Sequence, residues 1–256
     1  MYHPFSVAET IKTSWKVLRG NFAILAIYSI ISLVVLAFID FLNSFVLLNS
    51  SIVSWLIVFF LQMLIQSYLA LSFYKLILAL MDKQYYEFEF KDIWPSFKMV
   101  FRFIMIGLAY TLLAALFLFI NLLLKGYPLT LKVVELLEKL AIGYLLIRSV
   151  FCVCFIVDED SHSYEALLQS FIITKDNFLK ILLLILIVVG VIAFMLVFIL
   201  AAIALYESDD ESFMFRLGFY IWFVLAFPGV QVIIMVAYRK LVYAHQDVDD
   251  GFAETD

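Results

Sequence analysis

Residues 9–46 read ETIKTSWKVLRGNFAILAIYSIISLVVLAFIDFLNSFV, an amphipathic stretch that runs directly into a long apolar segment. Its opening pattern is Glu9-x4-Ser14-Trp15-x3-Arg19-x-Asn21-Phe22. The pattern returns 156 residues later as Glu165-x4-Ser170-Phe171-x3-Lys175-x-Asn177-Phe178, again in front of an apolar segment. A match at one constant offset predicts that one unit, a surface helix followed by a membrane span, is used twice.

The whole chain is strongly apolar. Of its 256 residues 66% are hydrophobic, and the mean hydropathy is +1.06. Soluble domains carry about 45–50% apolar residues, so part of the solvent of this fold must be lipid. Six apolar runs are long enough to be spanning helices, at about 22–46, 53–81, 99–124, 140–157, 178–206 and 214–242. Transmembrane β-strands would instead be short alternating segments. We therefore predict an all-α polytopic membrane protein.

The basic residues predict the orientation of the chain. With both termini on one side, that side carries twelve Lys and Arg residues and the other side carries four, with Arg148 inside a span. Because Lys and Arg accumulate in cytoplasmic loops, both termini are predicted to be cytoplasmic. The twelve are Lys12, Lys16, Arg19, Lys75, Lys83, Lys91, Lys98, Arg102, Lys175, Lys180, Arg239 and Lys240; the four are Lys125, Lys132, Lys139 and Arg216.

The spans predict one transmembrane domain over 1–246, built as three hairpins. Two are related, parallel repeat units at about 6–81 and 162–243, and the third is an intervening hairpin at about 92–157. Residues 247–256 form an acidic tail that is predicted to be disordered. The exterior connections at 47–52, 125–139 and 207–213 are too short to hold a domain, so we expect no soluble catalytic domain here.

Each copy of the repeated pattern has helix-start signals. Ser6 and Glu9 have capping-box spacing, and an apolar stripe made of Val7, Ile11, Trp15, Leu18 and Phe22 suits a helix lying in the membrane interface. In the second copy we expect Asp158, Glu159 and Asp160 to lie at the start of a helix that Ser161 or Ser163 caps. A ligand or ion site at these acids is the alternative. Each unit also closes with an aromatic-basic pair, Tyr74-Lys75 and Tyr238-Arg239, which we interpret as an interface anchor.

Arg148 is the leading candidate for a functional side chain, because charged groups inside membrane spans are costly. It lies about nine residues from either end of the predicted fourth span, so we place it near the middle of the bilayer. A structural ion pair with Asp40 or Glu138 is one role, and contact with a substrate or a lipid headgroup is the other, since arginine suits phosphate.

The remaining intramembrane polar residues predict packing rather than chemistry. Gln62, Gln66 and Asn121 are expected to form hydrogen bonds between helices, with a polar permeation path as the alternative. Pro228 is expected to kink the last span, for packing or for gating. Cys152 and Cys154 fall on different helix faces and are expected to be packing residues. His3, His162 and His245 are scattered, so neither a metal site nor a cofactor is predicted.

Residues 144–177, YLLIRSVFCVCFIVDEDSHSYEALLQSFIITKDN, carry a family pattern. It consists of a span with an Arg, an acidic pair, an E-A-L-x-x-S surface helix, and a basic residue and Asn-Phe before the next span. In this pattern the chain resembles the membrane-domain family named after glycerophosphoryl diester phosphodiesterase and related uncharacterised bacterial inner-membrane proteins of the YciC type. Such proteins often have Pro-Gly where this chain has Ile142-Gly143, which removes the basis for expecting a broken fourth helix. The enzymatic activity in the family name belongs to a separate soluble domain, so nothing catalytic carries over.

These observations predict a multi-pass protein of the bacterial inner membrane that is not an enzyme. We expect a scaffold or accessory subunit that interacts with membrane lipids or with another membrane protein, and not with nucleic acid. The alternative is a transporter or flippase of amphipathic small molecules or lipids. The oligomeric state is not predicted.

Overall fold

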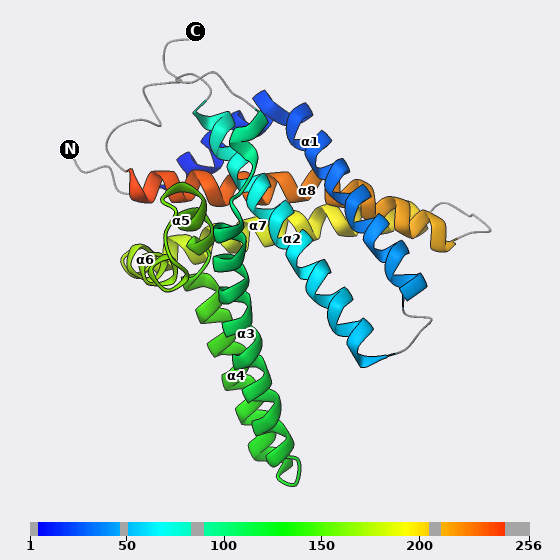
Figure 1. Cartoon of the computed structure of the whole chain (residues 1–256). Helices are drawn as coiled ribbons and strands as arrows, with labels where there is room; N and C mark the ends of the chain where they lie inside the picture. The colour runs from blue at the N-terminus through cyan, green and yellow to red at the C-terminus, as the bar shows by residue number, and fades with distance from the viewer. Residues whose placement is uncertain (1–4, 47–50, 83–89, 205–210, 244–256) are drawn as a thin grey trace. The chain divides into compact units, whose positions relative to one another are not determined.

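The computed structural model describes residues 5–46, 51–82, 90–204 and 211–243, which are helices joined by short turns (Figure 1). Within this part of the chain, six helical segments are long and apolar enough to cross a membrane. They are Val7–Ser44, Ile52–Met81, Lys91–Leu123, Pro128–Asp158, Phe178–Val197 and Gly218–Val242. The chain is therefore an all-helical, polytopic integral membrane protein, as predicted. The acidic tail at 247–256 lies outside the described residues, as do residues 47–50 and 207–210 of two predicted exterior connections.

The chain folds into two compact units. Unit 1 comprises Met1–Trp94 and Leu179–Asp256, and unit 2 comprises Pro95–Phe178. The predicted repeat unit at 162–243 thus begins in unit 2 and continues in unit 1, so the sequence repeat does not coincide with a compact unit. That the two copies are related parallel repeats within a single domain stays a prediction.

Unit 1 is built around three helices that pack against one another. These are α1 (Val7–Val46), α2 (Ile52–Met81) and α8 (Glu211–Val242), together with the short η2 (Phe90–Ile93) and the long apolar α7 (Phe178–Ala204). α1 and α2 run side by side in opposite directions, and α8 packs against both (Figure 1). The buried side chains include Leu25, Leu71, Phe73, Ile77, Val232, Met235, Val236 and Tyr238. The core therefore lies at the second half of α2 and of α8, while the first half of α2 is exposed.

α1 contains a break at the point where the sequence predicted a turn into the span. Asn21 has non-helical backbone angles, φ −123° and ψ 15°. Its side-chain Nδ2 donates to the Val17 carbonyl at 3.1 Å, which supplies a donor to a carbonyl at the end of the first helical segment. In the second copy, α6 (Ser163–Lys175) ends before the aligned Asn177, and α7 begins at Phe178. Both copies thus interrupt the helix at the same asparagine.

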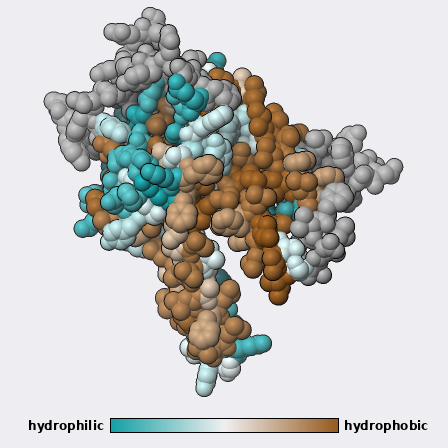
Figure 2. Space-filling view, in the orientation of Figure 1, coloured by the Kyte–Doolittle hydropathy of each residue, from teal (hydrophilic) through white to brown (hydrophobic). Residues whose placement is uncertain are grey.

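Unit 2 is a long helical hairpin with two short helices at one end. α3 (Phe97–Leu123) and α4 (Pro128–Arg148) form the hairpin, and α5 (Cys152–Asp158) and α6 follow. The prediction of an exterior connection over 125–139 is wrong, because α4 already begins at Pro128, a residue favoured in the first turn of a helix. Figure 2 shows the hairpin as hydrophobic along its length, with hydrophilic residues at its tip and around α5 and α6. This is the surface that a spanning hairpin requires.

Candidate functional site

Arg148 lies at a break in the fourth span. α4 ends at Arg148 and α5 begins at Cys152, so residues 149–151 interrupt the helix. The span runs over Pro128–Asp158, which places Arg148 20 residues from one end (148 − 128) and 10 from the other (158 − 148). These counts run along the helical segment, so the position of Arg148 near the middle of the bilayer stays a prediction. The break also lies six residues beyond Ile142-Gly143, where the family pattern would have put it (149 − 143).

Ser170 of α6 bridges the two sides of this break. Its hydroxyl donates to the Arg148 carbonyl at 2.7 Å and accepts the Phe151 backbone N–H at 3.2 Å. From α3, the Tyr110 hydroxyl contacts Ser149 Oγ at 2.6 Å. A helix interruption inside an apolar segment needs such partners, since lipid offers none to the freed backbone groups.

The guanidinium of Arg148 lies against aromatic rings. Its Cζ is 5.3 Å from the ring centroid of Phe171 and 5.8 Å from that of Tyr144. Its Nε is buried and has no hydrogen-bond partner among the described residues. Cation–π contact of this kind compensates part of the loss of water around a cation. Phe171, which the sequence assigned to the interface motif, therefore packs under Arg148.

Of the two acidic partners suggested for Arg148, Glu138 is engaged by another residue and Asp40 belongs to the other compact unit. Glu138 Oε2 accepts a hydrogen bond from Asn121 Nδ2 at 2.8 Å, so the prediction of an Arg148–Glu138 pair is wrong for this structure. Ten residues of α4 separate the two positions, about 15 Å along a helix, which is beyond ion-pair distance. Asp40 is exposed near the end of α1 in unit 1.

The acids Asp158, Glu159 and Asp160 do not begin a helix as predicted. Asp158 is the last residue of α5 and Glu159 caps its C-terminal end. Asp160 has a positive φ of 52°, a conformation that Asp tolerates better than most residues, and it forms an ion pair with Arg102 of α3. The segment is thus a tight connection rather than a helix start.

The start of α6 also differs from the prediction. Its N-cap is His162, whose backbone N–H donates to Glu165 Oε2 at 3.3 Å. The two predicted capping serines make other contacts: Ser161 Oγ donates to Gln169 Oε1, and Ser163 Oγ donates to the Arg102 carbonyl. These bonds fasten α6 to the rest of unit 2.

The other polar candidates lie apart from one another. Gln62 Oε1 accepts from Asn43 Nδ2 at 3.5 Å, which links α2 to α1 as the sequence predicted, whereas Gln66 is exposed. α8 remains helical through Pro228. Lys175 is the exposed last residue of α6, and Asn177 lies in the turn before α7.

The aromatic-basic pairs that end the two sequence repeats, Tyr74-Lys75 and Tyr238-Arg239, are not exposed interface anchors. Tyr74 and Tyr238 are buried in the core of unit 1. Arg239 pairs with Asp82 at 2.7 Å, and Lys75 donates to the Trp94 carbonyl at 3.1 Å. These residues hold unit 1 together at this end.

The two surface segments turn mostly small residues inward and leave larger apolar side chains outward. In α1 the buried residues are Thr10, Ser14 and Val17, and in α6 they are Ala166, Ser170 and Thr174. Apolar side chains form an outward stripe on each segment: Trp15 is 64% exposed, and Tyr164 and Ile172 are exposed too. Outward apolar side chains on such segments suit contact with lipid.

A groove opens in unit 1 beside the first of these stripes. It has a volume of about 630 Å³ and lies between α1, α7 and α8. The lining comprises Ile11, Ser14, Trp15, Leu18, Arg19 and Phe22 of α1; Ile187, Val188, Val191, Ile192 and Met195 of α7; and Leu225, Ala226, Gly229, Val230 and Ile233 of α8. The volume is in the range of pockets that hold small molecules, and its walls are almost wholly apolar.

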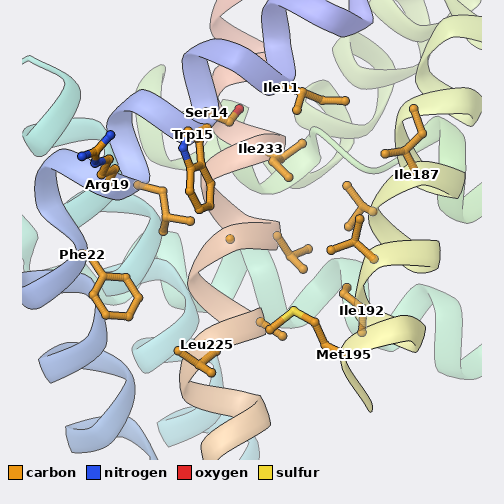
Figure 3. Close-up of a pocket in the computed structure, with 16 residues that line it drawn as sticks. Ile11, Ser14, Trp15, Arg19, Phe22, Ile187, Ile192, Met195, Leu225 and Ile233 are labelled. Atoms are coloured by element: carbon orange, nitrogen blue, oxygen red, sulfur yellow. The ribbon is translucent and has the colours of Figure 1, made fainter. Parts of the chain in front are cut away.

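The polar groups of the groove lie at one rim (Figure 3). The stem of Arg19 lines the edge, and its guanidinium points away from the apolar side chains. The ring of Trp15 reaches toward Ile233 and Leu225, with its indole nitrogen on the same side as Arg19. Ser14 Oγ donates to the Thr10 carbonyl at 2.7 Å. The groove can therefore accept an apolar body and place a polar end at Arg19.

No family model matches the chain, and no curated protein or solved structure matches it either. The resemblance to the phosphodiesterase-named membrane-domain family therefore stays a prediction.

Sequence reasoning found Trp15 and Arg19 but missed the groove between α1, α7 and α8. The sequence signal for this groove is Gly229, which has no side chain at the point where α8 faces α1. A Cβ added there would lie 3.9 Å from Leu18 Cδ2. No pattern in the sequence predicts that α7 faces α1 and α8. In the described part of the chain, no cluster of three or more His, Cys, Asp or Glu residues could hold a metal ion.

Proposed function

We propose that this integral membrane protein is a non-catalytic scaffold that holds membrane lipid on its helices. The groove between α1, α7 and α8 carries this proposal. Its walls of apolar side chains provide burial for an acyl chain. We also propose that the protein resides in the bacterial inner membrane with both termini in the cytoplasm.

The outward apolar stripes of the two surface segments support the same function. Trp15 on α1 and Tyr164 and Ile172 on α6 project from helices whose inner faces are fastened to the protein. Amphipathic helices of this type bind a membrane surface through their apolar side. A chain with such segments in both units is suited to ordering the lipid around it.

Bound phospholipid is the direct test of the scaffold role. The chain is purified in a mild detergent, and its phosphorus content per mole of protein is compared with that of a control membrane protein of similar size. We expect at least one phospholipid to remain per chain after extensive washing. A protein that emerges free of phospholipid would contradict this function.

The orientation is tested separately with C-terminal fusions to alkaline phosphatase and to a green fluorescent protein. A cytoplasmic C-terminus gives fluorescence and no phosphatase activity. The opposite pattern would contradict the proposed topology.

A lipid flippase is the second candidate, and the break after Arg148 favours it. Transporter sites are often built where spanning helices are discontinuous. Reconstituted chains would then speed the exchange of a fluorescent phospholipid between leaflets, and Arg148→Leu would abolish this exchange at equal protein incorporation. Exchange at the rate of empty vesicles would reject the candidate.

A further inference from the structure

The groove in unit 1 is partly open, because side chains that line it from α7 and α8 remain exposed. Ile187 and Val191 line it from α7, yet Val191 remains 54% exposed, and Leu225 on the α8 side is exposed as well. α7 is tied to α8 by the Trp222 indole N–H, which donates to the Ile192 carbonyl at 3.3 Å. A gap between such apolar walls is filled in a membrane by hydrocarbon, because neither water nor empty space is stable there.

The charge at the rim selects the polar end of that hydrocarbon. Arg19 projects beyond the apolar lining while its stem covers it, the usual arrangement for an arginine at a membrane interface (Figure 3). Lys12 and Lys16 precede Arg19 on the same helical segment. The carboxylate of this segment, Glu9, pairs with Lys240, with 3.7 Å between Glu9 Oε2 and Lys240 Nζ. Arg19 is the charged residue among those that line the groove, so its rim carries a cation, and an arginine fork binds phosphate oxygens in a bidentate manner.

The indole of Trp15 completes an amphipathic rim. Its ring reaches into the groove, and its N–H is a donor on the same side as the guanidinium. Tryptophan favours the headgroup level, where one part of the ring is apolar and the other is polar. The apolar walls thus suit the hydrocarbon part of an amphipathic molecule, and the rim suits its polar headgroup.

We propose that the groove binds one acyl chain of an anionic phospholipid, with the lipid phosphate against Arg19. The chain lies along Leu18, Val191 and Leu225, and the headgroup stays outside at the rim formed by Trp15 and Arg19. This inference rests on the proposed scaffold function and specifies its lipid class.

Two variant pairs test the inference. Arg19→Gln removes the rim cation, and Lys175→Gln is its control because Lys175 is the aligned basic residue outside the groove. Val191→Trp fills the groove, and Val189→Trp is its control: Val189 lies on the same helix, is 55% exposed and does not line the groove. Each protein is equilibrated in mixed micelles with equal amounts of phosphatidylglycerol and phosphatidylethanolamine, and bound lipid is counted by native mass spectrometry.

We expect wild type, Lys175→Gln and Val189→Trp to retain one phosphatidylglycerol in at least fivefold excess over phosphatidylethanolamine. Arg19→Gln should bring this ratio close to one, and Val191→Trp should lose the bound lipid. Equal retention of both lipids by wild type, or an unchanged ratio in Arg19→Gln, would overturn the inference and leave the scaffold function standing. Unchanged retention by Val191→Trp would overturn it as well. Absence of any bound lipid would overturn both, and because Arg19 lies at the exposed rim, its variant decides the outcome even if Val191→Trp fails to fold.

Discussion

Ser170→Ala is expected to destabilise the protein more than Ser14→Ala does, although the two serines occupy aligned positions of the repeated pattern. Both are buried, at 0% and 2% exposure. Ser170 donates to the Arg148 carbonyl at 2.7 Å and accepts the Phe151 N–H at 3.2 Å, so its hydroxyl serves two backbone groups at a helix break. Ser14 donates to the Thr10 carbonyl at 2.7 Å, four residues earlier in its own helix.

The expected loss of stability in Ser170→Ala depends on which hydrogen bonds the Phe151 N–H and the Arg148 carbonyl keep. Without the hydroxyl of Ser170, the Phe151 N–H loses this acceptor, whereas the Arg148 carbonyl keeps the longer bond from Thr174 at 3.4 Å. A buried polar group that loses its partner costs about 1–3 kcal/mol. Hydrogen bonds between membrane helices average only about 0.6 kcal/mol, because the unfolded chain in the membrane finds other partners. Two hydrogen bonds are lost, and the Arg148 carbonyl keeps one other donor, so the expected loss of stability for Ser170→Ala is about 2 kcal/mol.

Ser14→Ala is expected to cost about 0.5 kcal/mol or less. A hydroxyl that bonds back to the carbonyl four residues earlier shares an acceptor with the helix itself, and such bonding adds little or slightly destabilises. The alanine also has the higher helix propensity.

Reversible unfolding in mixed micelles with increasing dodecyl sulfate, followed by far-ultraviolet circular dichroism, measures both variants. A loss of about 2 kcal/mol corresponds to roughly a 30-fold change in the unfolding equilibrium constant. Losses that agree within about 0.5 kcal/mol would refute the reasoning, since the two serines would then act alike despite their different partners. A loss below about 0.5 kcal/mol for Ser170→Ala would refute it as well.

Three further predictions use the same unfolding measurement. Gly143→Ala should leave the stability unchanged or raise it by about 0.5–1 kcal/mol, because a Cβ at this helical position meets no atom within 4 Å; a loss above about 1 kcal/mol would contradict this. Glu138→Leu should cost about 1 kcal/mol by removing the acceptor of Asn121, and Asn121→Leu combined with it should recover most of that loss; additive losses would show that the pair is not coupled. Arg239→Ala should cost about 1–3 kcal/mol by leaving Asp82 at the end of α2 without its 2.7 Å partner, while Arg239→Lys should retain part of the stability; equal losses in the two variants would contradict an electrostatic role.

The repeated pattern identified the position of the helix breaks but not the packing of the helices around them. Asn21 and Asn177 mark the break in both copies, since an amide side chain supports non-helical backbone. The connection over 125–139 was misread because Lys132, Glu135, Glu138 and Lys139 lower its hydropathy, although Pro128 is an ordinary helix-start signal. The interruption after Arg148 has no comparable marker, because the residue that satisfies it, Ser170, lies on another helix.

The sequence by itself determined the class of this protein and its six long apolar segments, although not the residue at which the fourth begins. Both follow from local composition: a run of apolar residues of sufficient length is stable only in lipid, and only a helix satisfies its own backbone there. Tertiary structure decided the role of each polar residue. Arg148 lies over Phe171 instead of pairing with Glu138, Ser170 joins two helices while the aligned Ser14 bonds within one, and Arg19 becomes the rim of a groove. Inside a membrane an isolated polar group is unstable, so its role depends on which neighbouring helix supplies a partner, and residue spacing along one helix does not contain that information.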